Sequence, residues 1–326
     1  MNTRLSTLPM VAVFAGLAVT SFCPSAADDF PNPSRTLELI VPYAPGGPAD
    51  IASRIIQSPL SQELGIPVIV VNRPGAGGAV AMDAVLRARP DGYTVAATAN
   101  ATLVTVPAVN PNVSYQLTDF AAIGSYAVDY QAIIGRPDSR WRTIEEFIAH
   151  ARKNPGQLSY GSSGTGGVSY FNMEILKMTE DLQITHVPYQ GTGPVKTAIV
   201  GGHVDVATSA MGAFMPLVQA NKVVFLVVTS PKRLESLPNV PTMQEKGYRS
   251  VSLNTVMMLL APANVPPQAL SRLRTALSSA MSKREVKEQM EKASLIPDYQ
   301  GPDATVAALQ AEIRSVKSVM SKLKPN

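Results

Sequence analysis

The sequence has little cysteine and little charge. Its 326 residues include one cysteine, so neither a disulfide nor a cysteine metal site can form within one chain. Charged residues make up 16% of the chain, below the roughly 25% of a typical soluble protein. The 28 Lys and Arg residues against 24 Asp and Glu give a net charge of +4, and no run of five like charges occurs. This pattern disfavours a nucleic-acid partner.

Long apolar runs are also missing. The stretch Val11–Val19 is much shorter than the roughly 20 residues of a membrane span. Arg4 precedes it and the small residues 25–27 follow it, which predicts a secretory signal peptide over residues 1–27. An uncleaved anchor is the alternative. Cleavage would remove Cys23 and leave a soluble, exported chain with 27 basic and 24 acidic residues, a net charge of +3.

Short apolar runs alternate with helical patterns along the rest of the chain. The expected strands are Leu37–Val41, Val68–Val71, Tyr93–Ala97, Leu158–Tyr160, Thr185–Val187, Val204–Ala207, Val224–Val228 and Met257–Ala261. The expected helices are Ala49–Leu64, Gly78–Ala88, Phe147–Ala151 and Val168–Lys177, with two more opened by Pro266-Pro267 and by Asp303. This alternation predicts an α/β fold with a mainly parallel sheet.

Three local signals refine the helices. Thr143 and Glu146 have the spacing of a capping box. Asp303 is expected to cap a final helix that runs to about Leu323. Pro59 is expected to kink or restart the first helix, because proline removes a backbone donor and clashes with the preceding turn.

Four strand-to-helix turns are rich in small residues. They are Tyr43–Asp50, Asn72–Gly78, Gly161–Gly167 and Pro188–Gly193. Ligands of open α/β sheets bind beyond the carboxyl ends of the strands, where such turns lie. Glycine lets a ligand approach the backbone, and the free N–H groups of the next helix favour an anion. The alternative is that these glycines only make tight turns.

Enzyme motifs are not completed. No G-x-x-x-x-G-K or G-x-G-x-x-G pattern occurs, and Gly161–Thr165 fails G-x-S-x-G at its last position. His150, His186 and His203 lack zinc spacing, and His186 is interpreted as a core histidine that could also face a cleft. No metal, cofactor or catalytic residue is expected. A hydrolase stays open, because catalytic triads assemble in space.

The motifs together closely resemble the Bug family, the receptor proteins of tripartite tricarboxylate transporters. They are Val41–Asp50, Asn72–Gly78 followed by Pro90–Thr94, Tyr160–Gly164, His186–Gly191, Gly201–Asp205 and Val228–Arg233. The resemblance implies a periplasmic solute-binding protein with two α/β domains and a hinged cleft. By analogy, domain 1 comprises residues 28–130 and 255–326, and domain 2 comprises 131–254.

The resemblance also implies ligand and partners. A small organic carboxylate, either a dicarboxylate or an aromatic acid, is held by N–H groups, hydroxyls and waters. A monomer would deliver it to membrane transporter subunits, or in an alternative role present it to a sensor kinase. The implied ligand-binding residues are Tyr43, Ala44, Gly46, Gly47, Asp50, Thr98, Asn100, Thr102, Ser162, Ser163, Gly164, Tyr170, Tyr189, Gly191, Thr192, Asp205 and Ser209.

Some of these residues have a second interpretation. Asp50 can stabilise the helix start, and Asp205 can stabilise its loop. Tyr170-Phe171 stands where many relatives carry His-Leu. The aromatic pair either adds core packing or lines the pocket, and a pocket wall of this kind would favour an aromatic carboxylate.

Overall fold

Two separate sheets organise the computed structural model, which describes residues 30–189 and 191–322. The first sheet has the strand order β11-β4-β10-β3-β1-β2. Its strands are β1 (Leu37–Val41), β2 (Val68–Asn72), β3 (Thr94–Ala99), β4 (Phe120–Asp129), β10 (Thr255–Pro262) and β11 (Ile296–Gln300). We call this half of the molecule the six-stranded lobe.

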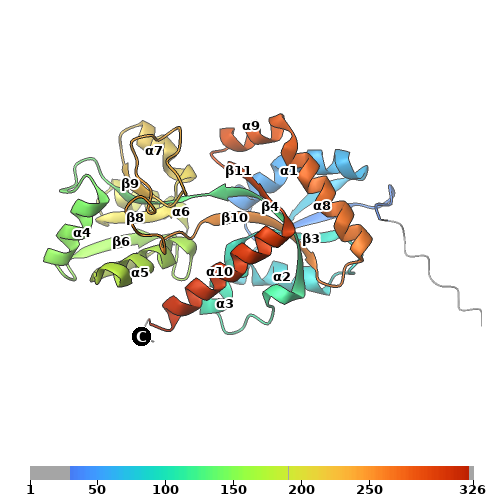
Figure 1. The fold of residues 1–326 in the computed structure, drawn as a ribbon, viewed down its shortest axis with the longest axis horizontal. Coiled ribbons are helices and arrows are strands. Elements are labelled where there is room, and N and C mark those ends of the chain that lie inside the picture. The colour runs from blue at the N-terminus through green and yellow to red at the C-terminus, as the bar shows by residue number, and fades with distance from the viewer. Residues whose placement is uncertain (1–29, 190, 323–326) are drawn as a thin grey trace, which may run out of the picture.

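The second sheet has the order β7-β6-β8-β5-β9 and defines the five-stranded lobe. Its strands are β5 (Gln131–Gly135), β6 (Leu158–Ser162), β7 (Ile184–Pro188), β8 (Val206–Ala210) and β9 (Val224–Val228). Figure 1 shows the two lobes side by side.

Both sheets are mixed, so the expectation of a mainly parallel sheet was wrong. β1 lies parallel to β2 and β3, and β6 lies parallel to β7 and β8. β10 is antiparallel to β3 and β4, and β5 is antiparallel to β8 and β9. β10 and β11 therefore run opposite to the other four strands of the first sheet, and β5 runs opposite to the other four strands of the second.

Helices cover both faces of each sheet. They are α1 (Pro48–Leu64), α2 (Ala79–Arg87), α3 (Thr105–Val109), α4 (Ile144–Lys153), α5 (Val168–Glu180), α6 (Thr192–Val200), α7 (Met215–Gln219), α8 (Pro267–Ser282), α9 (Arg284–Lys292) and α10 (Pro302–Met320). Leu37 and Leu39 point into one core with α1, α8 and α9, whereas Ile40 joins a second core with α2 and α10. This alternation follows from the two-residue period of a strand.

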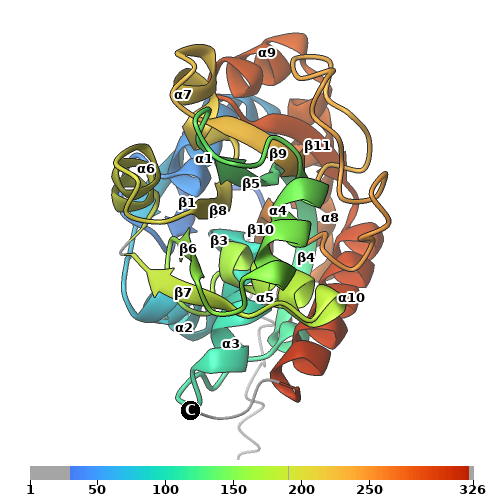
Figure 2. The same ribbon diagram turned by 90° about the vertical axis from the view of Figure 1, so that its left-hand side faces the viewer.

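The chain crosses between the sheets at two places. Tyr130 separates β4 from β5, and residues 229–254 separate β9 from β10. The predicted domain boundaries, at 130/131 and 254/255, fall at these connections; the division into domains stays a prediction. Figure 2 shows α6 and α10 on opposite sides of the molecule.

Two local expectations were wrong. α1 runs unbroken through Pro59, because buried Ile56 and Leu60 on either side hold the helix against the sheet. Such packing outweighs the roughly 3 kcal/mol that an internal proline costs. Gly301 caps α10, and Asp303 lies inside its first turn.

The predicted signal peptide lies outside the described residues. Within the described part of the chain, no helix is long and apolar enough to cross a membrane.

Candidate functional site

Three helices begin directly behind the predicted ligand loops. The N-caps of α1, α5 and α6 are Gly47, Gly167 and Gly191, and none has a capping side chain. The helices α2, α8, α9 and α10 also lack a capping side chain, so what sets α1, α5 and α6 apart is their place behind the loops. In α4, which begins away from these loops, the hydroxyl of the N-cap Thr143 accepts the N–H of Glu146 at 3.2 Å. The first N–H groups of an uncapped helix favour an anion.

Asp50 fastens the first loop of the six-stranded lobe. Its buried carboxylate accepts the backbone N–H of Gly46 at 2.9 Å and the side-chain amide of Asn72 at 2.9 Å. Arg54 pairs with it at 3.0 Å, and Asn72 also donates to the Tyr43 carbonyl. Burial raises the pKa of Asp50, but the hydrogen bonds from Arg54, Gly46 and Asn72 hold it below the ordinary value.

These contacts favour a loop-stabilising role for Asp50. Its neighbours Ala44 and Gly47 lie on the same loop, with Ala44 exposed to solvent. Sequence reasoning singled out the motif around Asn72 but gave that residue no role. The sequence signal for its role was an amide side chain at a strand end, beside a glycine-rich loop that such a side chain can hydrogen-bond.

A hydroxyl cluster lies at the end of β3. The hydroxyls of Thr98 and Thr102 are 2.9 Å apart, and Thr102 donates to the carbonyl of Ala99 at 2.9 Å. Burial strongly raises the pKa of Tyr43, whose hydroxyl lies beside Thr98 and Ala99. The structure therefore brings together three of the predicted residues, Tyr43, Thr98 and Thr102.

The side chain of Asn100 hydrogen-bonds to the connection between the lobes. Its side-chain amide donates to the carbonyl of Asn254 at 2.8 Å and to Glu312 at 2.6 Å. Its side-chain oxygen accepts the N–H of Val256 at 3.1 Å. Both donor hydrogens are thus used, so the predicted ligand contact has little support here.

In the five-stranded lobe, the loops after β6 and β7 are joined through the backbone. The N–H of Tyr189 donates to the carbonyl of Ser162 at 3.0 Å, and Gly191 donates to that of Ser163 at 3.2 Å. The Ser163 hydroxyl lies 3.3 Å from that of Ser169 in α5. Gly164 and Thr192 belong to the same pair of loops, with Gly164 at φ +141°.

The loops of the two lobes approach each other at Gly166. A Cβ atom added to Gly166 would lie 2.8 Å from a methyl carbon of Val109 in α3. The φ of Gly166 is +79°, which also favours glycine. The loop that contains Ser162 and Ser163 therefore lies against the six-stranded lobe.

Asp205 and Ser209 occupy different ends of β8. Asp205 accepts the N–H and the hydroxyl of Ser159 at 2.8 and 3.0 Å, at the amino ends of the strands. It is not brought together with the other residues. Ser209 lies at the carboxyl end, and its buried hydroxyl has no partner in the described part of the chain.

The two aromatic residues at the start of α5 have different environments. Phe171 is fully buried in the core. Tyr170 is partly buried and packs on His186, with ring centroids 4.9 Å apart. The arrangement of Phe171 fits core packing.

A serine–histidine pair tests the hydrolase alternative. The Ser162 hydroxyl lies 2.7 Å from Nε2 of His186, but Ser162 is fully buried. Among the described residues, no carboxylate hydrogen-bonds to His186; the nearby Glu174 bonds to Tyr160 and Lys177 instead. This geometry does not provide an accessible nucleophile with an oriented base.

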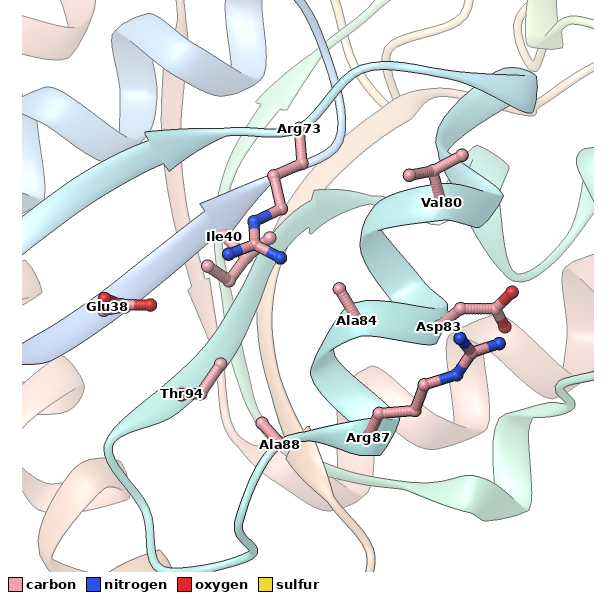
Figure 3. A pocket seen from close by; sticks show the side chains of 9 residues that line it. All are labelled: Glu38, Ile40, Arg73, Val80, Asp83, Ala84, Arg87, Ala88 and Thr94. Atoms are coloured by element: carbon pink, nitrogen blue, oxygen red, sulfur yellow. The ribbon is translucent and has the colours of Figure 1, made fainter.

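A cavity of about 630 Å³ lies elsewhere, between the six-stranded sheet and α2. Figure 3 shows Arg73 reaching over Ile40 on one side and Arg87 near Asp83 on the other. It shares no residue with the predicted ligand-binding set. The loops directly before α1, α5 and α6 contribute no residue to its lining, so it is not the space that those helix starts face.

Known proteins resemble the chain along most of its length. The model of the tripartite tricarboxylate transporter family receptors matches residues 52–324. The chain belongs to this family of periplasmic solute-binding receptors. BugT of Bordetella pertussis is 28% identical to the receptor, with 99% of each chain covered.

Solved structures agree with this family assignment. MatC of Rhodopseudomonas palustris, solved with bound malate, is 27% identical to the receptor with a TM-score of 0.75. The match covers 89% of this chain and all of MatC. A second R. palustris protein, solved with adipate, is 26% identical with a TM-score of 0.77, covering 89% of this chain and 97% of the other. The α/β fold predicted from the sequence, and its likeness to periplasmic binding proteins implied by the resemblance, are confirmed.

Proposed function

We propose that the receptor captures a small aliphatic dicarboxylate between its lobes and delivers it to a tripartite tricarboxylate-type transporter. It acts in the periplasm, as a monomer, after removal of residues 1–27. It binds its ligand without chemical turnover.

The uncapped starts of α1, α5 and α6 carry this proposal. Each helix follows a predicted ligand loop, and each has glycine at its N-cap. The basic side chain on α1, Arg54, is paired with Asp50. Carboxylate recognition then depends on N–H groups and on hydroxyls such as that of Ser163.

The aliphatic class is preferred to the aromatic one. Malate and adipate are bound by two similar receptors. The aromatic alternative depended on Tyr170-Phe171 lining the pocket, and Phe171 is buried in the core. Two helix starts in one lobe and one in the other suit a ligand with a carboxylate at each end.

Thermal stability of the refolded receptor tests the ligand class. Refolding removes co-purified ligand, and malate, succinate, adipate, benzoate, phthalate and glucose are then added separately. A ligand at about 1,000 times its Kd stabilises by roughly 4 kcal/mol, which raises the Tm by several degrees. We expect aliphatic dicarboxylates to raise Tm most.

Three outcomes would contradict the proposal. A shift with benzoate or phthalate alone would favour the aromatic class. No shift with any carboxylate, in a receptor that unfolds cooperatively, would exclude carboxylate capture. Product in the mass spectrum of the incubated ligand would show turnover.

A further inference from the structure

We propose that His186 is a positioning residue: it donates its Nε2–H to Ser162 and so fixes both ligand loops of the five-stranded lobe. The link from this role to ligand affinity depends on the function proposed above, whereas the link to loop structure does not.

The imidazole ring of His186 contacts two tyrosine rings. Tyr160, its neighbour across the β6–β7 pair, stacks on it with centroids 4.7 Å apart and planes 24° apart. Tyr170 of α5 packs on it at 4.9 Å. Two elements therefore set the position of the ring, and its Nε2 is directed at Ser162.

The contacts of the Ser162 hydroxyl assign the proton on His186. Its oxygen lies 2.7 Å from His186 Nε2, 3.1 Å from the carbonyl of Gly164 and 3.4 Å from the N–H of Gly164. The carbonyl can only accept, so in our assignment the single hydroxyl hydrogen is donated to it. The Ser162 oxygen then accepts from Nε2–H and from the Gly164 N–H, so each of the three polar groups around the hydroxyl has a complementary partner.

Charged groups near His186 come from α5. Glu174 accepts the Tyr160 hydroxyl at 2.7 Å and pairs with Lys177 at 2.8 Å, which anchors the stacked tyrosine. Burial lowers the pKa of His186; the negative Glu174 opposes this and the positive Lys177 adds to it. The neutral ring is therefore the main form at pH 7, and its one N–H points at Ser162.

The fixed Ser162 then holds the second loop. Its carbonyl accepts the N–H of Tyr189, and the carbonyl of the adjacent Ser163 accepts that of Gly191. Gly191 is the N-cap of α6. One imidazole N–H thus orders the starts of α5 and α6 together.

Three variants separate the contribution of the His186 N–H from the contribution of ring stacking. His186→Phe keeps an aromatic ring but loses the donor. His186→Gln loses the ring but places an amide N–H near Nε2. Ser162→Ala removes the acceptor, and His203→Phe is the control, because this exposed histidine lies outside both loops. Hydrogen exchange of the 162–167 amides is measured for each receptor without ligand.

We expect exchange over 162–167 to rise about fivefold or more in His186→Phe, the equivalent of about 1 kcal/mol for one hydrogen bond. Ser162→Ala should do the same, and the double variant should add little. The exchange rate of His186→Gln should stay nearer to that of wild type. The exchange rate of His203→Phe should equal that of wild type. Unchanged exchange in His186→Phe, or exchange in His186→Gln as fast as in His186→Phe, would overturn the role.

Nitrogen NMR of the imidazole and a titration complete the test. The ¹⁵N shifts should report the Nε2–H tautomer at pH 7.5; the Nδ1–H tautomer would overturn the proposal. Malate and adipate should each bind His186→Phe at least about fivefold more weakly than wild type. Equal affinity would overturn the link to ligand binding. Failure of wild type to bind either acid contradicts the proposed function instead, and leaves the exchange result to decide the role of His186.

Discussion

The carboxylate of Asp50 accepts the backbone N–H of Gly46 at 2.9 Å, so the first turn of α1 holds the loop that precedes it. Asn72 at the end of β2 donates to the same carboxylate. The loop after β1, the end of β2 and the start of α1 therefore share one buried charge. This arrangement gives the loop a fixed shape before ligand arrives, which lowers the entropic cost of binding.

Asp50→Ala should destabilise the receptor by about 2–3 kcal/mol, because it leaves the N–H of Gly46 and the amide of Asn72 without their charged acceptor. Urea unfolding at pH 7 measures this loss. Glu38→Ala, on the other face of the first sheet, serves as the control. A free energy of unfolding equal to that of wild type would contradict the proposal that Asp50 stabilises this loop.

Acidification should remove the contribution of Asp50. Its folded-state pKa lies below the ordinary value, so its stabilisation is complete above the unfolded pKa of about 4 and is lost as pH falls through the folded pKa. The stability difference between wild type and Asp50→Asn should therefore shrink below about pH 4. Urea midpoints at pH 7, 4 and 3 measure it, and a difference that is the same at all three values would contradict this linkage.

Much of the fold follows from local sequence. The strands Leu37–Val41 and Val224–Val228 are confirmed to the residue, because each is a short apolar run bounded by turn residues. β4 and β5 were missed. Their run is long, buried at every position of the two strands except Ala121 and interrupted only at Tyr130, so it shows no alternation. Its division between two sheets depends on contacts distant in sequence.

Ser163→Ala should weaken malate and adipate binding without unfolding the receptor. Ser163 lies on the loop before α5, where its hydroxyl can reach a ligand that occupies the helix start. One lost hydrogen bond to a carboxylate costs about 1.5–3 kcal/mol, or roughly 10- to 150-fold in Kd. Isothermal titration calorimetry gives the Kd.

Ser159→Ala is the matched control for Ser163→Ala. It lies in the same strand region but bonds to Asp205 at the opposite end of the sheet. We expect a lower Tm and an unchanged Kd. Equal Kd values for wild type and Ser163→Ala would remove this residue from the site.

Asp129→Asn should stabilise the receptor at high pH. Asp129 ends β4 with 3% of its surface exposed and accepts the N–H of Gly212 at 3.2 Å. Burial raises its pKa to about 7, against which the Gly212 hydrogen bond acts weakly. The folded state thus binds more protons than the unfolded state between about pH 4 and 7, so stability falls as pH rises through this window.

The asparagine variant stays neutral and can still accept the Gly212 N–H. It should exceed wild type by about 2–4 kcal/mol at pH 8 and match it near pH 4, as measured by urea unfolding. Burial also raises the pKa of Glu312 to about 7, so its ionisation changes stability with pH in the same direction. The same unfolding series on Glu312→Gln therefore shows how much of the pH dependence of stability comes from each of the two carboxyl groups. A stability gap that is equal at pH 4 and pH 8 would contradict burial of a titrating Asp129.

The candidate site was harder to predict than the fold. The loops around Gly46 and Ser163 were recognisable from their small residues. The resemblance implied Asn100 and Asp205 as ligand residues, with loop stabilisation as the alternative for Asp205. Their hydrogen bonds go to Glu312 and Ser159, because a motif does not report where a side chain points. Likewise, the contact of His186 with Ser162 could not be predicted, because it depends on the register of β6 against β7.

Gly166→Ala tests the contact between the lobes. The new methyl would meet Val109 at 2.8 Å, and alanine at φ +79° is strained by about 1 kcal/mol or more. The collision should hold the loops of the two lobes apart and weaken malate and adipate binding at least about fivefold by calorimetry. Val109→Ala in the same chain removes the colliding methyl carbons but leaves the backbone strain. The double variant should therefore regain most of the affinity while keeping most of the loss in Tm. If Val109→Ala restores no affinity, backbone strain alone explains the defect, and the approach of Gly166 to Val109 has no part in ligand capture.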